Sequence, residues 1–494
     1  MRKSGILMHI SSLPSPFGIG TLGQNAYDFV DFLAKTNTRF WQILPINPTG
    51  YGDSPYQSFS VFAGNPYFID FNLLHQKGLL KKTDYETIPW IANQRHIDYT
   101  FLFDHVYKVL RKAYCNFFKD SKYDSFEQLN NFWLDDYALF MALKFKNNHT
   151  SWFNWDEKIS LRDKDTIKRL KKSLADEIDF YKFIQFTFYE QWTNLKQYAN
   201  KNNVEIIGDL PIYVAYDSVD VWANPELFLL DEDKKPIEVA GCPPDFFSTT
   251  GQLWGNPLYN WAYHKSAKYS WWIKRLKHAS ENFNVTRIDH FRGFESFYAI
   301  PYGNSTAEIG EWRKGPDIEL FVEARKEIQN LHIIAEDLGF LTPEVLKMLN
   351  KSRYPGMKVL QFAFDNPSNT YLPHNYTKTN CIVYTGTHDN DTLYGWVSSL
   401  PKKNLSFCKK YLNISRKKDI PKSVIKLAWS SVADTSIAQI QDFLKLDSSC
   451  RMNTPSTTTN NWQFRALSKD FTEELAKEIY KLNKLYNRNG GLKK

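Results

Sequence analysis

Cysteine is scarce in this sequence, and the cysteines that occur are widely spaced. The 494 residues include five cysteines, Cys115, Cys242, Cys381, Cys408 and Cys450, an odd number that contains no CxxC pair. The pattern indicates neither a disulfide framework nor a zinc site. A reducing compartment fits it best, and we therefore expect a cytoplasmic protein.

Features of membrane and nucleic-acid partners are also missing. No run of about 18 apolar residues occurs, so no segment is expected to span a membrane. The first 15 residues, MRKSGILMHISSLPS, start with positive charge, but His9 and the Ser/Pro cluster break the apolar run that a signal peptide needs. The net charge of +8 is scattered over polar helical faces and the C-terminal tail, which indicates solvated surface and no nucleic-acid partner.

What the sequence does have is a recurring strand-length apolar segment that ends in polar or Gly/Pro residues. Helical patterns separate many of these segments, for example residues 25–37 and 176–200. Segments that are apolar on both faces and alternate with helices predict a parallel sheet covered by helices. With seven or eight such units and no GxGxxG after the first, the fold predicted is a (β/α)8 TIM barrel rather than a doubly wound sheet. The segments are GILMHISSLPS, RFWQILPINPTG, VEIIGDLPIY, VTRIDHFRG, HIIAEDLG, MKVLQFAFD and CIVYTGTHDND.

The units are unevenly spaced, so we expect one catalytic unit over residues 1–494 that carries insertions. Residues 65–165 have mostly helical patterns and are predicted to form an inserted subdomain, in which Ser125 and Gln128 suggest a capping box. Residues 241–261, GCPPDFFSTTGQLWGNPLYNW, are rich in Pro, Gly and aromatics. They are predicted to be a long ordered loop on the strand-end side of the barrel, beside the active site.

Carboxylates follow several of the predicted strands. Asp209 ends VEIIGD, Asp289 ends VTRID, Glu336 and Asp337 end HIIAED, and Asp389 follows CIVYTGT. The C-terminal ends of barrel strands form the floor of the active site, so these acids are expected to converge there. Each could instead cap a helix, and together they could bind Ca²⁺ or Mg²⁺, although no EF-hand spacing or phosphate-binding loop accompanies them. Neither a metal nor a cofactor is expected.

Two carboxylates in different environments are what glycoside chemistry needs, one ionised and one protonated. Asp289 has Arg287 two residues away on the same strand face, and this cation would keep Asp289 ionised as a nucleophile. Glu336 has no basic neighbour in its strand, so burial would raise its pKa and suit it to act as acid and base. Asp389, next to His388, could hold sugar hydroxyls and stabilise the developing positive charge.

At the level of whole motifs, the chain resembles the amylomaltase-type 4-α-glucanotransferases, glycoside hydrolase family 77 of the α-amylase clan. The motifs are HISSLPSPFGIG, LPINPTGYGDSPYQSFSVFAGNPY, IIGDLPIYVAYDSVDVWANPELF, GCPPDFFSTTGQLWGNPLYNW, RIDHFRGF, IIAEDLG, PGMKVLQFAF and YTGTHDNDT, with a weaker match in RMNTPSTTTNNWQFR. The resemblance implies the same roles for the three carboxylates. It further implies that the substrate is contacted by Arg287, His290, His388, Asp209, Tyr56 and Trp254.

The sequence departs from the expected family pattern at Ser456. Where the family would read Asn-Thr-Pro-Gly, this chain has Asn453-Thr454-Pro455-Ser456. If the backbone needs a positive φ there, serine costs more than glycine.

The function expected from these observations is a retaining transfer of α-1,4-glucan segments between maltooligosaccharide or starch-type chains, through a covalent intermediate. An α-amylase-like hydrolase and a glycan-binding barrel without activity are the alternatives. The sequence leaves open the preferred chain length, the ratio of transfer to hydrolysis, and whether the protein is a monomer or a homodimer.

Overall fold

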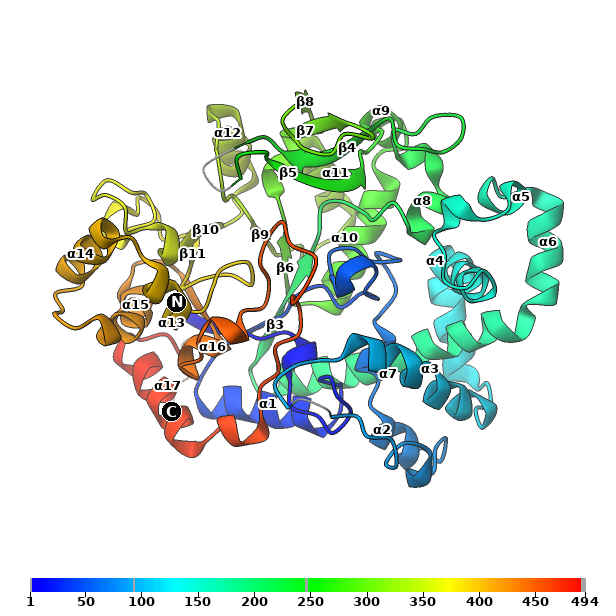
Figure 1. Ribbon diagram of the computed structural model, residues 1–494, viewed down its shortest axis with the longest axis horizontal. Helices are drawn as coiled ribbons and strands as arrows, with labels where there is room; N and C mark the ends of the chain where they lie inside the picture. Colours follow the sequence, from blue (N-terminus) through cyan, green and yellow to red (C-terminus); the bar gives the residue numbers. More distant parts are fainter. Residues whose placement is uncertain (1, 92–93, 245–247, 490–494) are drawn as a thin grey trace.

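Eight parallel strands form a nearly closed barrel in a computed structural model that describes residues 2–91, 94–244 and 248–489 (Figure 1). Their order around the sheet follows their order in the chain, and every neighbouring pair of strands is parallel. The predicted (β/α)8 barrel is therefore confirmed. The strands are β1 (Lys3–Leu7), β2 (Phe40–Gln42), β3 (Glu205–Leu210), β6 (Val285–Ile288), β9 (Ile333–Ala335), β10 (Gly356–Val359), β11 (Cys381–Tyr384) and β12 (Thr435–Gln439).

The seam between β9 and β10 is closed by individual hydrogen bonds. The Ala335 N–H donates to the Pro355 carbonyl at 2.9 Å, and the Met357 N–H donates to the Asp337 carboxylate at 2.6 Å. Gly356 permits this approach, because a Cβ there would lie 2.3 Å from the Asp337 carboxylate. Asp337 therefore serves the barrel wall and does not join Glu336 at the cavity.

Strand β12 was not among the segments predicted from the sequence. Its residues, TSIAQ, are all buried, but Thr435, Ser436 and Gln439 interrupt the apolar pattern that marks the other strands. It pairs with β1 on one side and β11 on the other and completes the barrel.

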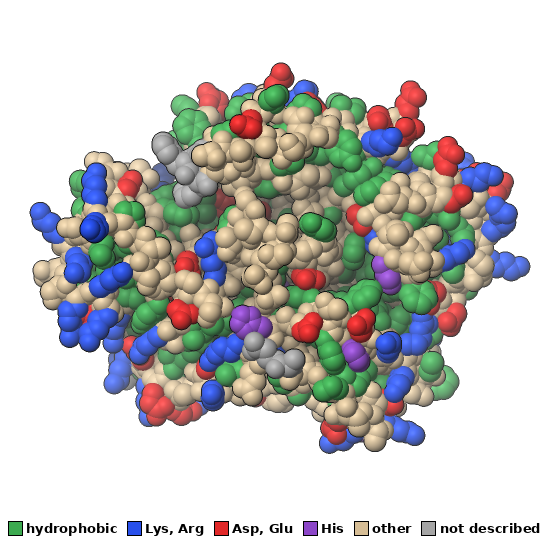
Figure 2. All heavy atoms as spheres, viewed as in Figure 1, with side chains coloured by type: hydrophobic (Ala, Val, Ile, Leu, Met, Phe, Trp, Pro, Cys, Tyr) green, Lys and Arg blue, Asp and Glu red, His purple; other side chains and the backbone are tan. Residues whose placement is uncertain are grey.

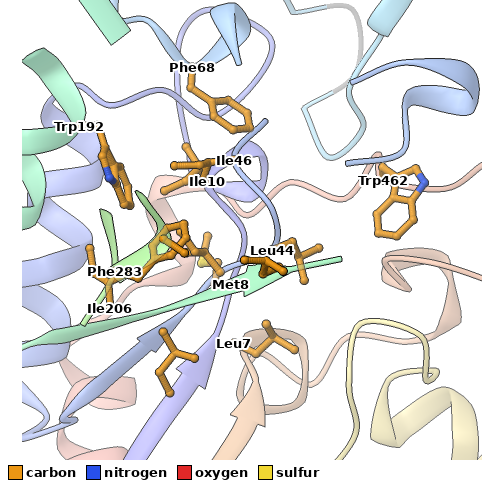
Figure 3. Close-up of a cluster of buried hydrophobic side chains, with 14 of the residues drawn as sticks. Leu7, Met8, Ile10, Leu44, Ile46, Phe68, Trp192, Ile206, Phe283 and Trp462 are labelled. Carbon is orange, nitrogen blue, oxygen red and sulfur yellow. The ribbon is translucent and has the colours of Figure 1, made fainter. Parts of the chain in front are cut away.

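Helices cover the outside of the barrel. The predicted helices at 25–37 and 176–200 are confirmed as α1 (Gln24–Lys35) and α7 (Ala175–Lys201). Figure 3 shows how α7 contributes to the core, where Trp192 packs edge-on to Phe283, 6.1 Å between ring centroids, beside Ile206 of β3. Further outer helices are α10 (Ser270–Asn282), α11 (Glu319–Glu327), α12 (Pro343–Ser352), α13 (Leu393–Ser399), α14 (Lys402–Tyr411), α15 (Ile420–Ser430), α16 (Ile440–Phe443) and α17 (Glu473–Leu485).

The long excursion between β2 and α7 is helical. It contains α2 (Phe71–Gln76), α3 (Tyr99–Cys115), α4 (Ser121–Lys146), α5 (Glu157–Ser160) and α6 (Lys164–Ser173). That residues 65–165 form a unit of their own stays a prediction. The capping box is wrong: α4 begins four residues earlier, where the Asp120 carboxylate accepts the Tyr123 N–H, and the Ser125 hydroxyl donates to the Ser121 carbonyl.

A second, antiparallel sheet lies outside the barrel in the order β5-β4-β7-β8. Two excursions build it, one after β3 and one after β6, which also explains why local sequence patterns did not reveal it. Residues 241–261, predicted as a loop, contain the end of β4 and all of β5, and residues 245–247 of that segment lie outside the described residues. The strands are β4 (Glu238–Cys242), β5 (Gln252–Pro257), β7 (Ser296–Pro301) and β8 (Glu311–Lys314), and the short helices α8 (Val219–Ala223) and α9 (Trp261–Ser266) flank the first two.

Both ends of the described chain meet at the N-terminal side of the barrel. Lys3 forms an antiparallel bridge with Asn489, and the neighbouring Arg488 is fully buried. Its guanidinium donates to the Lys3 carbonyl at 3.1 Å and the Trp429 carbonyl at 2.6 Å. The C-terminal segment is thereby fastened to the first strand.

Charged side chains are spread over the face of the molecule that contains the ends of the barrel strands in view (Figure 2). On the face in Figure 2, Lys and Arg side chains lie around the periphery with Asp and Glu between them, and the centre is mostly uncharged. Cys115, Cys381, Cys408 and Cys450 form no disulfide. Among the described residues, no helix is both long and apolar enough to cross a membrane.

Candidate active site

The C-terminal ends of the barrel strands open into a cavity of about 580 Å³. Convergence at this end is expected because all eight strands are parallel. Arg287 and Asp209 are buried and do not line the cavity. The other predicted site residues do line it: Tyr56, Trp254, Asp289, His290, Glu336, His388 and Asp389.

Arg287 connects two carboxylates beneath the cavity floor. Its Nη1 donates to both oxygens of Asp209, at 2.8 and 2.7 Å, and its Nη2 donates to Asp289 Oδ1 at 2.9 Å. The Tyr56 hydroxyl donates to the Asp209 carboxylate at 2.7 Å. Asp209 thus fixes the guanidinium and the phenol, while Asp289 lines the cavity and bonds to Arg287 through Oδ1 alone.

Glu336 and Asp289 differ in electrostatic environment. Burial and the neighbouring Asp289 raise the pKa of Glu336 to about 8, although Arg287 and two backbone N–H groups oppose the shift. These N–H groups, of His290 and Leu338, each donate to one Glu336 oxygen at 2.7 Å. Burial also raises the pKa of Asp289, but its largest opposing influence is the Arg287 guanidinium in direct contact with it. Glu336 is therefore protonated at neutral pH, and Asp289 is the one paired with a cation.

His290 contributes a neutral imidazole to the cavity. Burial and the nearby Arg292 lower the pKa of His290 to about 3. Its backbone is left-handed, with φ of 49°, and its ring meets the Trp254 ring edge-on at 4.9 Å. Nε2 is buried and has no hydrogen-bond partner among the described residues, so it is available to a bound ligand.

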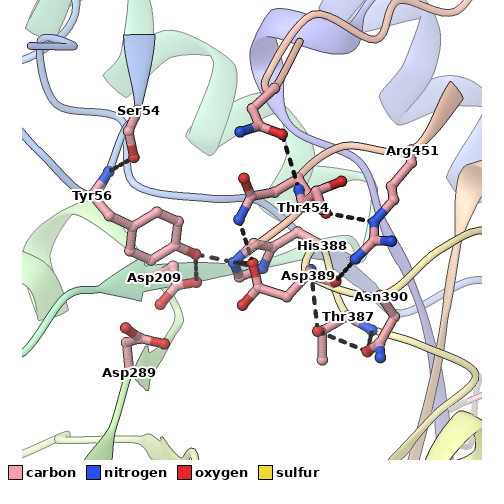
Figure 4. A network of polar contacts seen from close by, with 12 residues as sticks. Ser54, Tyr56, Asp209, Asp289, Thr387, His388, Asp389, Asn390, Arg451 and Thr454 are labelled. Atoms are coloured by element: carbon pink, nitrogen blue, oxygen red, sulfur yellow. Dashed lines mark hydrogen bonds and ion pairs between the residues drawn. The ribbon is translucent and has the colours of Figure 1, made fainter. Parts of the chain in front are cut away.

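Asp389 is held by residues that the sequence reasoning did not assign. The Asn453 amide donates to Asp389 Oδ1 at 2.6 Å, and Arg451 Nη2 donates to the Asp389 carbonyl at 2.6 Å (Figure 4). His388 stacks on Tyr56 with 5.0 Å between ring centroids. Asn453 and Arg451 lie in the RMNTPSTTTNNWQFR motif. The motif resembles the family, but it does not by itself indicate which of its residues contact Asp389.

The family profile described as 4-alpha-glucanotransferase matches residues 8–469 of the chain. The chain belongs to this family. The 4-alpha-glucanotransferase of Clostridium butyricum is 50% identical over 97% of this chain and all of the relative, and that of Thermus thermophilus is 43% identical over 96% of each. The structure of the amylomaltase from Streptococcus agalactiae in complex with acarbose superimposes with a TM-score of 0.96 at 41% identity, covering 99% of this chain and 100% of that one.

The chain is accordingly a glycosyl-transferring enzyme of the 4-alpha-glucanotransferase type. A more distant structure, the amylomaltase from Corynebacterium glutamicum, shares the fold with a TM-score of 0.81 at 16% identity. The resemblance drawn from the motifs is confirmed across the whole chain.

Asp442 is a further residue of this 4-alpha-glucanotransferase fold that the sequence did not reveal. It is fully buried in α16 and accepts the Thr385 hydroxyl at 2.6 Å and the Leu393 N–H at 2.7 Å. These two partners flank the loop that carries His388 and Asp389. Burial raises the pKa of Asp442 to about 7, so the carboxyl is held by hydrogen bonds rather than by a cation.

The loop after Asn453 confirms the expectation about Ser456. Its φ is 63°, in the left-handed region that favours glycine, and Asn460 and Trp462 follow at 60° and 64°. Each such residue costs about 1–2 kcal/mol. Ser456 also lines the cavity, so the backbone there sits in a strained but functional position.

The effect of a substitution at Ser456 should therefore depend on whether the new residue tolerates a positive φ. Ser456→Gly is expected to leave the KM for maltotriose unchanged and to raise stability by about 0.5 kcal/mol, because relief of strain exceeds the added entropy of the unfolded chain. Ser456→Val, whose branched Cβ resists positive φ, should raise this KM several-fold. Initial rates and urea midpoints measure both. Equal behaviour of the two variants would contradict a left-handed requirement.

Proposed function

We propose that this enzyme transfers segments of α-1,4-linked glucan from a donor maltooligosaccharide or starch-type chain to the 4-hydroxyl of an acceptor glucan or glucose, with retention of configuration. The observation that carries the proposal is the pairing of Asp289, in contact with Arg287, with Glu336, whose pKa is raised to about 8. A carboxylate in contact with a cation, beside a carboxyl group whose pKa is raised, is what a retaining double displacement uses.

In the first step, the Asp289 oxygen that is not bonded to Arg287 attacks the anomeric carbon of the donor. The glycosidic bond to the leaving oxygen breaks, and the Glu336 proton passes to that oxygen, giving a covalent glycosyl-enzyme. In the second step, the acceptor 4-hydroxyl attacks the same carbon, its proton passes to Glu336, and the bond to Asp289 breaks. Bonds and protons balance, and no cofactor is needed.

The remaining residues orient the sugar in this mechanism. Asp389, fixed by Asn453, holds ring hydroxyls and stabilises the positive charge at the anomeric carbon. His290, with its unpartnered Nε2, and His388 bind the same sugar. Tyr56 and Trp254 supply flat rings to the cavity wall, while Arg287 and Asp209 keep Asp289 in position.

Hydrolysis is the competing outcome, since the same carboxylates would serve if water reached the intermediate first. The deciding experiment is incubation with maltotriose alone. Longer maltooligosaccharides together with glucose establish transfer, whereas glucose and maltose without longer products establish hydrolysis. Binding without any turnover would identify a glycan-binding barrel instead.

The pH profile should report Glu336. The first step needs a protonated Glu336, so kcat/KM for maltotriose is expected to fall about tenfold per pH unit above pH 8. It should also fall at low pH, where Asp289 becomes protonated. Circular dichroism at each pH separates this loss from unfolding. A basic limb with an apparent pKa near the ordinary value of a glutamate would contradict the assignment.

We also propose that the enzyme works in a reducing, cytoplasmic compartment, because Cys115, Cys381, Cys408 and Cys450 form no disulfide.

A further inference from the structure

A second groove lies on the outside of the barrel, away from the three carboxylates. It encloses about 180 Å³ between α4 of the helical excursion, the short helices α8 and α9, and the start of α10. Figure 1 shows α4 beside α8, with α5 and α6 farther out. A volume of this size suits one sugar ring with part of a neighbour.

Aromatic rings form the walls of this groove. The side chains of Phe132 and Tyr263 are 45% and 39% exposed, and Trp271 is partly exposed between them and the core. The Phe132 ring is held by an edge-on contact with Phe62, 5.3 Å between centroids. Flat rings that are exposed yet fixed in place suit stacking on the apolar faces of pyranose rings.

Polar groups with unused hydrogen-bonding capacity surround the rings. Among the described residues, Glu226 forms no ion pair and Trp271 Nε1 has no hydrogen-bond acceptor, while the Lys274 ammonium lies 5.6 Å from the centroid of the Phe132 ring. The Asn224 amide nitrogen donates to the Asp220 carbonyl at 3.3 Å, which leaves its oxygen free. The groove therefore offers both hydrogen-bond donors and acceptors, which suits sugar hydroxyls because each hydroxyl can donate and accept. A protein partner would need a far larger interface than this groove offers.

One loop connects the groove to the catalytic cavity. Gln57 lines the cavity and Ser60 lines the groove. Three residues of extended chain span at most about 11 Å, so one lining residue of the cavity and one of the groove lie within that distance of each other. A long glucan could occupy both at once, and the second contact would then add to affinity as an intramolecular event. A trisaccharide could not gain in this way.

We infer that the groove formed by Phe132, Tyr263 and Trp271 is a second binding site for α-glucan chains, which favours long donors over short ones. The inference deepens the proposed function and rests on it for the identity of the ligand. It assigns the groove no part in bond cleavage.

The test combines two partly exposed rings and one control. The double variant Phe132→Ala/Tyr263→Ala should raise the KM for long-chain amylose about three- to tenfold, while the KM for maltotriose changes less than twofold. Phe118→Ala, which removes an 86% exposed ring elsewhere on the helical excursion, is the matched control and should change neither. An equal rise in both KM values, or no rise with amylose, would overturn the inference.

Affinity electrophoresis provides a readout that does not depend on turnover. In gels containing amylose, the wild type should be retarded, and the double variant should migrate clearly faster than both the wild type and Phe118→Ala. Equal retardation of all three proteins, or none for the wild type, would refute the second site. A wild type that is retarded but inactive on maltotriose would refute the proposed function and leave the groove supported.

Discussion

Glu336→Gln is expected to lower the rate of transfer with maltotriose by about 10³-fold or more, and Asp289→Asn at least as much. The two losses should differ with a substrate whose leaving group needs no proton. With α-maltosyl fluoride, Glu336→Gln should still release fluoride and accumulate the covalent intermediate, whereas Asp289→Asn should not. Mass spectrometry of the intact protein detects the added maltosyl group.

The design separates an acid from a nucleophile because each variant removes one of the two. Loss of fluoride release in Glu336→Gln would contradict its assignment as an acid, and retention in Asp289→Asn would contradict its assignment as a nucleophile. The control substitution must not disturb the loop of Asp389. Gln361→Ala would disturb it, because the Gln361 amide donates to the Asp391 carbonyl at 2.7 Å. Lys484→Met, on the exposed face of α17, serves instead.

Stability gives an independent check on the same carboxyl. The pKa of folded Glu336, about 8, is above its ordinary value of 4.5, so the folded protein keeps a proton that the unfolded chain releases. The stability of the wild type should therefore fall as pH rises from about 4.5 to 8 through this group. Glu336→Gln lacks the proton exchange and should lose less stability over that range in urea titrations at successive pH values.

Arg488→Met should produce the largest loss of stability, about 3–5 kcal/mol, because the guanidinium is buried and its removal breaks several buried hydrogen bonds to backbone carbonyls. Among the described residues, no carboxylate bonds to it; its donors instead bond to β1 and to the end of α15 with the turn that follows. Burial, together with Arg2, lowers the pKa of Arg488 to about 9. The carbonyls belong to Lys3, Ala428, Trp429, Ser431 and Ala433.

Urea unfolding measures this loss, with Lys484→Met as the matched exposed control on the same terminal segment. Arg488→Lys should fall between the wild type and Arg488→Met, since lysine supplies three donors rather than five. The activity of the folded fraction should stay unchanged, because the residue lies at the opposite end of the barrel from the cavity. A loss below 1 kcal/mol would mean that water replaces the guanidinium at no cost.

The parts of the fold that were predictable depend on local pattern. Strands that are apolar on both faces, such as β11, and amphipathic helices, such as α1, reveal themselves in a few consecutive residues. The polar strand β12 did not, because the residues that bury it come from β1 and β11, far away in the chain. The antiparallel sheet was missed for the same reason, since it joins two separate excursions.

The features of the site likewise include some that follow from nearby sequence and others that depend on distant residues. The contrast between Asp289 and Glu336 follows from neighbours within their own strands, and the raised pKa of Glu336 agrees with that reasoning. The contacts of Asn453 and Asp442 with the loop of Asp389 join positions 49 to 64 residues apart. Asp337 shows the converse error, because a carboxylate next to Glu336 in sequence points into the barrel wall instead.

The pairing of β1 with β12 also constrains how the protein is made. When the first strand leaves the ribosome, its partner at Thr435–Gln439 has yet to be synthesised, so one edge of β1 stays unpaired through most of translation. The Arg488 contacts follow later still. The nascent chain therefore carries an open sheet edge and a half-formed catalytic floor, and is most exposed to aggregation and to chaperones, until synthesis is nearly complete.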